Sequence, residues 1–370
     1  MKKRNRGLSL VLSAAMAAGL ILSGCGGGNT STTAAADGTS AAGGTTAAAA
    51  ATEAPSSESG GGEKITIRIG HSMSEDNIYQ VCAEAFRDKA VELLGADRVE
   101  VIIYPNAVLG TQTEMIEAMQ MGTLDAVAFG RHSQIDSRLD VLNLPYLFSS
   151  DEHMTKVLRG DEGASVRERV AECFDSAGIK MLGMFEAGFR QITSSRKIEK
   201  MEDLKGLVIR TPNTPVLMDS FSAWGANPTP LDFSELYTAL QTKVVDAQEN
   251  PYQLISTSAF YEVQDYLCVT NHSTICDQLQ FSKKVWDTYP ADVQEALAEA
   301  GKYACDVAGE ENTKRNSELL AELKEKMEVT EMPAEEVAKM KDVVMEKVWP
   351  DYLVDDFSKQ LVADIQALAD

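Results

Sequence analysis

Along some segments apolar residues occupy every second position, which predicts strands. Along others they lie three and four positions apart, which predicts helices. Residues Ile65–Gly70 alternate between apolar and polar side chains, as half-buried strands do. From Ser74 to Leu94 the apolar residues are three and four apart, which predicts a helix. A strand, a helix and a strand follow at residues 99–104, 113–121 and 124–129. This order predicts a parallel sheet with helices on its faces.

The alternation resumes after residue 179 and predicts a second set of elements. Strands are expected at residues 180–185, 189–193, 207–210 and 244–247, and helices at residues 201–204, 214–224 and 234–242. Beyond Tyr289 the pattern is helical to the end, and Glu and Lys residues at four-residue spacing indicate a solvated face. Two α/β lobes with a helical C-terminal region fit the 370 residues better than one domain.

The first 63 residues show neither spacing and are expected to lie outside the fold. Four basic residues precede an apolar stretch, Leu8 to Leu22, that is too short for a membrane span. The stretch ends in Leu22-Ser23-Gly24-Cys25, which resembles the lipobox of bacterial lipoproteins. Residues 1–25 are interpreted as a lipoprotein signal peptide with Cys25 as the lipidated residue, the alternative being an ordinary signal peptide. Residues 26–63, rich in Gly, Ala, Ser and Thr, predict a disordered tether.

The charge balance narrows the classes of partner. The chain has 34 Lys and Arg against 56 Asp and Glu, a formal net charge of −22. Cleavage before Cys25 removes four positive charges and no negative one, so −22 becomes −26. A surface this acidic repels phosphates, so nucleic acid is not expected as a partner. An anionic ligand would have to meet a local concentration of positive charge.

The sequence shows no complete catalytic motif and no residue spacing typical of a metal site. Gly70-His71-Ser72-Met73-Ser74 departs from the G-x-S-x-G nucleophile motif at its last position. The four histidines lie far apart, and the five cysteines after Cys25 include no CxxC pair. A disulfide between Cys268 and Cys276 and buried free thiols both remain open. We therefore expect no metal, no cofactor and no catalytic activity.

Five segments, in order and at a characteristic spacing, carry a resemblance to a known family. They are Tyr104–Gly110 (YPNAVLG), Met121–Asp125 (MGTLD), Gly188–Ser194 (GFRQITS), Asp203–Pro212 (DLKGLVIRTP) and Phe233–Pro251 (FSELYTALQTKVVDAQENP). Together they resemble the solute-binding subunit of tripartite ATP-independent periplasmic (TRAP) transporters, the dicarboxylate-binding-protein-like family. The last segment is the most specific, and the resemblance covers residues 64–281.

The resemblance implies a two-lobed periplasmic-binding-protein-like fold of class II type, each lobe a sheet flanked by helices. Lobe I would take residues 64–187 and about 276–315, and lobe II residues 188–275 and about 316–370. The lobes would close on a small organic-acid anion and deliver it to the two integral membrane subunits of a TRAP secondary transporter. The protein would be exported and lipid-anchored to the outer face of the cell membrane. Two alternatives remain: a binding protein that presents its solute to a signalling receptor, and one that serves an ATP-driven importer.

The resemblance also implies ligand-binding residues in lobe II. Arg210, at the end of a predicted strand, matches the family's main carboxylate-binding arginine, and its planar guanidinium pairs well with a carboxylate. Arg190 matches a second arginine that contacts the ligand. Asn250 matches an asparagine that hydrogen-bonds the ligand, and Phe233 an aromatic residue that packs against it. The structural alternatives are a surface ion pair for Arg210, a turn before Pro251 for Asn250, and core packing for Phe233.

Lobe I is expected to add Ser72, which follows the first strand, Gln112, which follows a turn, and Arg131, which ends the third strand. Some family members carry a ligand-contacting Glu at the position of Gly130. Here glycine and its neighbour Arg131 replace that acid. The extra cation predicts a more anionic or more hydroxylated ligand than sialic acid, such as a uronate or a dicarboxylate.

Overall fold

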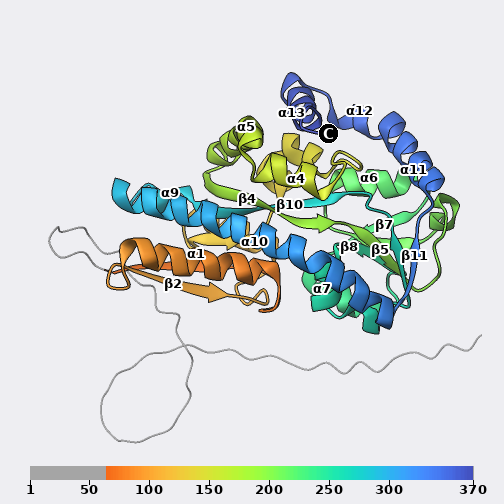
Figure 1. Ribbon diagram of the computed structural model, residues 1–370, viewed down its shortest axis with the longest axis horizontal. Helices are drawn as coiled ribbons and strands as arrows, with labels where there is room; N and C mark the ends of the chain where they lie inside the picture. The colour runs from red at the N-terminus through yellow and green to blue at the C-terminus, as the bar shows by residue number, and fades with distance from the viewer. Residues whose placement is uncertain (1–63, 370) are drawn as a thin grey trace, which may run out of the picture. The chain divides into compact units, whose positions relative to one another are not determined.

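Two β-sheets organise residues 64–369, the part of the chain that the computed structural model describes (Figure 1). The first sheet has the strand order β2-β1-β3-β10-β4. Its strands are β1 (Ile65–Gly70), β2 (Val99–Tyr104), β3 (Ala126–Ala128), β4 (Ile179–Phe189) and β10 (Thr274–Ser282). Strands β2, β1 and β3 are parallel, as predicted. Strand β10 is antiparallel to both β3 and β4, so the sheet is mixed rather than purely parallel.

The second sheet has the order β11-β9-β5-β8-β6-β7. Its strands are β5 (Gln191–Ser194), β6 (Val208–Thr211), β7 (Asn227–Pro230), β8 (Ala247–Asn250), β9 (Tyr266–Val269) and β11 (Glu328–Glu331). The parallel strands β7, β6 and β8 adjoin β5, which is antiparallel to β8 and β9. Strand β11 comes from the C-terminal region, which the sequence pattern predicted to be wholly helical.

Helices cover both sheets. The α-helices before residue 290 are α1 (Ile78–Leu94), α2 (Gln112–Met121), α3 (His132–Ile135), α4 (Asp151–Leu158), α5 (Ala164–Ser176), α6 (Pro215–Ala223), α7 (Phe233–Gln241), α8 (Tyr252–Thr257) and α9 (Lys283–Trp286). The later ones are α10 (Ala291–Lys326), α11 (Ala334–Lys347), α12 (Trp349–Tyr352) and α13 (Asp356–Gln366). Short 3-10 helices are η1 (Ser137–Asn143), η2 (Asp161–Gly163), η3 (Met201–Leu204) and η4 (Phe260–Glu262). Within residues 64–369, no helix has the length and apolar character needed to cross a bilayer.

Three segments connect the two sheets. Strand β4 passes into β5 through Arg190 alone, and β9 passes into β10 through residues 270–273. The Arg190 N–H donates to the Ser273 carbonyl at 2.8 Å, which joins these two crossing segments. The third connection is α10, a helix of 36 residues that packs on α1 and β4 at one sheet and on α8 and β11 at the other (Figure 1). Each sheet with its helices forms one lobe, so the expected two-lobed α/β fold is confirmed.

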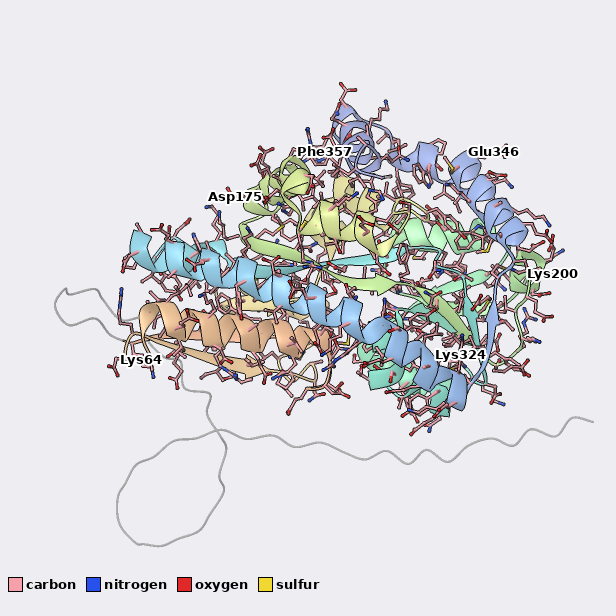
Figure 2. The ribbon with its side chains drawn as sticks, viewed as in Figure 1. Lys64, Asp175, Lys200, Lys324, Glu346 and Phe357 are labelled. Atoms are coloured by element: carbon pink, nitrogen blue, oxygen red, sulfur yellow. The ribbon has the colours of Figure 1, made fainter. Side chains whose placement is uncertain are left out.

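The C-terminal helices divide between the lobes. Helix α11 packs on α6 and η3, beside the second sheet, whereas α13 packs on α5 and η1. Phe357 of α13 (Figure 2) lies under the Arg138 guanidinium, 4.5 Å from ring centre to guanidinium carbon. The Ile365 carbonyl lies 2.8 Å from Nε2 of His153, which is buried in α4. Helix α13 therefore lies with lobe I, whereas the sequence assigned residues 316–370 to lobe II.

The five described cysteines are all free and buried. The disulfide between Cys268 and Cys276 that the sequence left open is therefore not formed. The predicted signal peptide, the lipidation site Cys25 and the tether at residues 26–63 lie outside the described residues.

Candidate functional site

Side chains from both lobes line one cavity of about 380 Å³. Six of the seven residues singled out from the sequence line it: Gln112, Arg131, Arg190, Arg210, Phe233 and Asn250. The seventh, Ser72, is not among the lining residues, but its hydroxyl accepts a hydrogen bond from Nε2 of the lining residue Gln112 at 2.8 Å. The fold thus brings residues that are far apart in the sequence to one place between the sheets.

Arg210 is held in this cavity without a counter-ion. It is the third residue of β6, and its side chain is folded back so that Nε and Nη2 both donate to the Leu231 carbonyl, at 3.0 and 2.7 Å. The residue is 2% exposed, and within residues 64–369 no carboxylate lies within ion-pair distance of its guanidinium. Burial lowers the pKa of Arg210 to about 9, and the nearby Arg190 and Arg131 act in the same direction. A bound anion would relieve this unfavourable burial of charge.

Arg190 is buried too, but its charge is balanced. Its guanidinium forms a two-point ion pair with Glu249, in which Nη2 lies 2.6 Å from Oε1 and Nε bonds to Oε2. Glu249 also contacts Nε2 of His272 at 3.3 Å. Burial alone would raise the pKa of Glu249, but Arg190 and His272 hold it below its usual value. The Nη1 group of Arg190 has no hydrogen-bond partner in the described part of the chain, and it remains available to a ligand.

Asn250 and Phe233 complete the wall from lobe II. Asn250 ends β8, is 2% exposed, and donates through Nδ2 to Gln248 Oε1 at 2.6 Å. Phe233 begins α7, where its ring lies 5.9 Å from the ring centre of Phe260 and 5.9 Å from the Arg210 guanidinium carbon. Both residues thus have structural contacts while they face the cavity.

The strand that ends in Asn250 was placed wrongly from the sequence. The apolar residues at 244 and 245 predicted a strand over 244–247, but the structure has it at Ala247–Asn250. Val244 is 62% exposed in a turn, because Lys243 before it adopts φ of 58°. Asn250 therefore lies inside the sheet, where Gln191 is its partner in β5, and not beyond a strand end.

Lobe I contributes polar groups at the other wall. Gln112 is the first residue of α2, a position fixed by the Thr111–Glu114 capping box. Arg131 follows β3 and is half-buried, and its Nη2 reaches only the Thr113 hydroxyl, at 3.4 Å. Like Arg210, it has no carboxylate within ion-pair distance among residues 64–369, and burial lowers its pKa.

Asp277 and Tyr79 are two cavity-lining residues that were not singled out from the sequence. Asp277 lies in β10 and is 2% exposed; one of its oxygens accepts the Gly130 N–H at 2.6 Å and the other accepts the Tyr79 hydroxyl. Burial raises the pKa of Asp277 to about 7. A Cβ atom at Gly130 would stand 2.9 Å from Gln278 Oε1 and 3.0 Å from Asp277 Oδ1 and the Cys276 carbonyl oxygen, so a larger residue here would crowd this carboxylate. A charged residue inside the otherwise buried run of β10 is the only signal that the sequence offered.

The described residues contain no cluster of three or more His, Cys, Asp and Glu side chains that could hold a metal ion. The polar groups that line the cavity include guanidinium, amide, hydroxyl and carboxylate groups and the His132 imidazole, beside the Phe233 ring and several aliphatic side chains. Such a set can bind a small polar anion by charge and hydrogen bonds.

Sequence comparison identifies the protein family of this chain. Residues 69–355 match the family model DctP, bacterial extracellular solute-binding protein, family 7. A solute-binding protein of Roseobacter denitrificans is 35% identical over 243 residues, which are 65% of this chain and 74% of that protein. The 2,3-diketo-L-gulonate-binding periplasmic protein YiaO of Escherichia coli is 31% identical over 256 residues, 67% of this chain and 76% of YiaO. The chain belongs to the DctP family of bacterial extracellular solute-binding proteins.

Solved structures agree with this assignment. A TRAP periplasmic solute-binding protein of Roseobacter denitrificans with bound L-galactonate has a TM-score of 0.73 and 30% identity, covering 81% of this chain and 98% of that one. A TRAP periplasmic solute-binding protein of Sulfurospirillum deleyianum with bound succinate has a TM-score of 0.75 and 28% identity, covering 82% and 98%. The resemblance to TRAP solute-binding subunits that the motifs carried is thus confirmed.

Proposed function

We propose that this protein captures a small organic-acid anion in the cavity between its lobes and delivers it to a TRAP secondary transporter. The observation that carries the proposal is Arg210, a buried guanidinium that lines the cavity and has no ion-pair partner within residues 64–369. Burying an unpaired charge is costly unless something pairs with it. A ligand carboxylate is the partner that this geometry lacks.

Capture would proceed by closure of the two lobes. Arg210, Phe233 and Asn250 come from lobe II, whereas Gln112 and Arg131 come from lobe I. An anion bound to one lobe gains the contacts of the other only when the lobes meet, so it favours the closed arrangement. Excluding water then strengthens the contact between guanidinium and carboxylate.

The ligand class follows from the cavity and from the relatives. The cavity of about 380 Å³ suits a small acid, and two of its arginines have no acidic partner within residues 64–369. The related proteins were named or crystallised with 2,3-diketo-L-gulonate, L-galactonate and succinate. A sugar acid or a short dicarboxylate is therefore the proposed ligand of this chain.

Substitution of Arg210 tests the proposal. Arg210→Ala should weaken acid binding about 30- to 3,000-fold, since truncating one partner of a buried charge pair costs about 2–5 kcal/mol. Arg210→Lys should also bind poorly, because an ammonium cannot form the two parallel bonds of a guanidinium. Isothermal titration calorimetry with a panel of sugar acids and dicarboxylates measures both.

The matched control is Arg98→Ala, which removes an exposed arginine paired with Asp292 on the outer surface. It should leave affinity unchanged. Near-wild-type affinity in Arg210→Ala, with its circular dichroism intact, would remove the carboxylate role from Arg210.

We propose further that the N-terminal segment anchors the protein at the outer face of the membrane. The support is sequence alone: a basic start, an apolar stretch, the lipobox-like cysteine Cys25 and a tether of small residues. Cys25→Ala should move the protein from the membrane fraction to the soluble fraction of its host. Retention in the membrane fraction would contradict the anchor.

A sensory role remains the second candidate, because a closing cleft can serve a receptor as well as a transporter. The two are separated by uptake. Deletion of the gene should abolish accumulation of the labelled acid under the transport proposal, and should leave it unchanged under the sensory one.

A further inference from the structure

Asp277 lines the same cavity as the three arginines. It lies in β10, is 2% exposed, and lines the cavity wall. Within residues 64–369 no Lys, Arg or His lies within ion-pair distance of its carboxylate. Burial of a carboxylate without such a partner opposes folding.

The orientation of this carboxylate is fixed. The Gly130 N–H donates to Oδ1 at 2.6 Å, and the Tyr79 hydroxyl donates to Oδ2. A carboxylate has about four acceptor positions, so each oxygen keeps one more for another donor. Tyr79 and Gly130 also line the cavity, which places the donors, the carboxylate and the ligand space together.

The charges around the cavity do not favour a second carboxylate on the ligand. Arg190 is balanced by Glu249, whereas Arg131 and Arg210 have no ion-pair partner among the described residues. Asp277 adds a carboxylate to the cavity wall, and the charge of Asp232 acts on both Arg131 and Arg210 to raise their pKa values against the effect of burial. Glu117, at the exposed edge, adds a negative charge that does not favour a second anionic group.

Neutral polar side chains supply most of the remaining polar wall. Gln112, Thr113, Asn143 and Asn213 line the cavity with amides and a hydroxyl. These groups both donate and accept, as the hydroxyl groups of a polyol do. A second carboxylate would instead need further cations.

We propose that Asp277 is a specificity-determining residue that accepts hydrogen bonds from ligand hydroxyls and excludes a second carboxylate, so that the site selects polyhydroxylated monocarboxylates. This rests on the proposed function and narrows it to aldonates and uronates. A site built to accept from hydroxyls rejects analogues without them, because its own buried acceptor is then left unpaired. A carboxylate at the same place would meet a like charge.

The test compares acids that differ only in these groups. Galactonate and galactarate share the four hydroxyls on C2 to C5 and differ at C6, where galactarate has a second carboxylate in place of a primary hydroxyl. Hexanoate has the carbon chain of galactonate without its hydroxyls. Calorimetry at pH 8 should show that wild-type protein binds the best of galactonate, galacturonate and erythronate about 100-fold more tightly than galactarate, succinate or hexanoate. This measurement needs no variant.

Asp277→Asn should then lower the preference for the hydroxy acid over galactarate by about tenfold or more, since a hydrogen bond to a charged group is worth about 1.5–3 kcal/mol. The matched control is Asp125→Asn, which changes another buried aspartate, outside the cavity and paired with Arg68. It should leave the ratio unchanged. Arg210→Ala should instead weaken binding of every acid that carries a carboxylate.

The outcomes separate the two proposals. Wild-type protein that binds succinate or galactarate as tightly as the hydroxy acids would overturn the role of Asp277 alone. A folded Asp277→Asn variant with an unchanged ratio would do the same. Wild-type protein that binds no acid of the panel would overturn the proposed function, and the role of Asp277 with it.

Discussion

Arg210 and Asp277 are two charged side chains that the fold buries at a cost to itself. Each is 2% exposed, and neither has an ion-pair partner among residues 64–369. Burial lowers the pKa of Arg210 to about 9 and raises that of Asp277 to about 7, and both shifts reflect a charged form that has lost its water. Such pairs of perturbed groups in a cavity are characteristic of functional sites.

The cost of burying Asp277 should be visible as a pH dependence of stability. Its folded-state pKa of about 7 lies above its ordinary value of 3.8. The native state therefore binds the proton more tightly, so this stabilisation is complete below about pH 4 and is lost as the pH rises through 7. Asn at this position undergoes no such loss. Asp277→Asn should raise the melting temperature by about 2–8 °C at pH 8 and by less at pH 5.

Scanning calorimetry at the two pH values checks this. The two groups that hold the carboxylate, the Tyr79 hydroxyl and the Gly130 N–H, do not titrate between pH 5 and pH 8. An equal change in melting temperature at both pH values would show that Asp277 titrates normally.

The segments that cross between the sheets are tied together by one buried ion pair. Arg190 stands between β4 and β5, Glu249 belongs to β8, and His272 stands between β9 and β10. Their mutual contacts join both strand crossings to β8, so any movement between the lobes acts on these contacts. The pair therefore both positions Arg190 in the cavity wall and stabilises the crossing.

Glu249→Gln should be strongly destabilising, because it leaves Arg190 buried without its counter-charge. The expected loss is about 3–5 kcal/mol in urea unfolding. The matched control is Glu92→Gln, which changes an exposed partner of Lys89 and should have little effect. Similar small losses in the two variants would mean that the buried pair does not hold the crossing together.

Local patterns predicted the elements whose apolar residues follow a simple period. The strands Ile65–Gly70 and Val99–Tyr104 were placed as the structure has them, and α1 differs only in its start. Strands β8 and β10 were missed or displaced, because both bury polar residues that a hydrophobic pattern reads as exposed. These residues are tolerated inside because neighbouring side chains and strands bond to them, which one segment does not reveal.

The residues of the candidate site were also predicted only in part. Six of the seven predicted residues line the cavity, since motif resemblance transfers positions that spacing alone does not give. Tyr79 and Asp277 were not found, because they are 198 residues apart and their contact exists only in the folded chain. Glu249 lies inside a recognised motif, but its ion pair with Arg190 was not foreseen for the same reason.

At the scale of the whole molecule, an acidic chain surrounds a cavity whose wall carries three arginines. The formal charge is −22, and labelled charged residues such as Lys200, Lys324 and Glu346 lie on the outer surface (Figure 2). An approaching anion is repelled by the body before it meets Arg131 and Arg210 in the cavity. The affinity of the site and the rate of approach are therefore governed by charges of opposite sign.

Association rates should show this opposition. Raising the salt concentration from about 10 to about 150 mM shortens the screening length from roughly 30 to 8 Å, which weakens the repulsion at long range. The on-rate for an organic acid, measured by stopped flow, should rise or stay level. A tenfold fall would show that the cavity attracts the ligand over longer distances than the body repels it.

The long helix α10 limits how the two lobes can move relative to each other. It spans both lobes without a proline, over about 54 Å at 1.5 Å per residue for its 36 residues. Helices of this kind curve gently and do not fold sharply. Any rotation of one lobe relative to the other must therefore bend α10 or shift its packing on one of the two sheets, in addition to changing the two strand crossings.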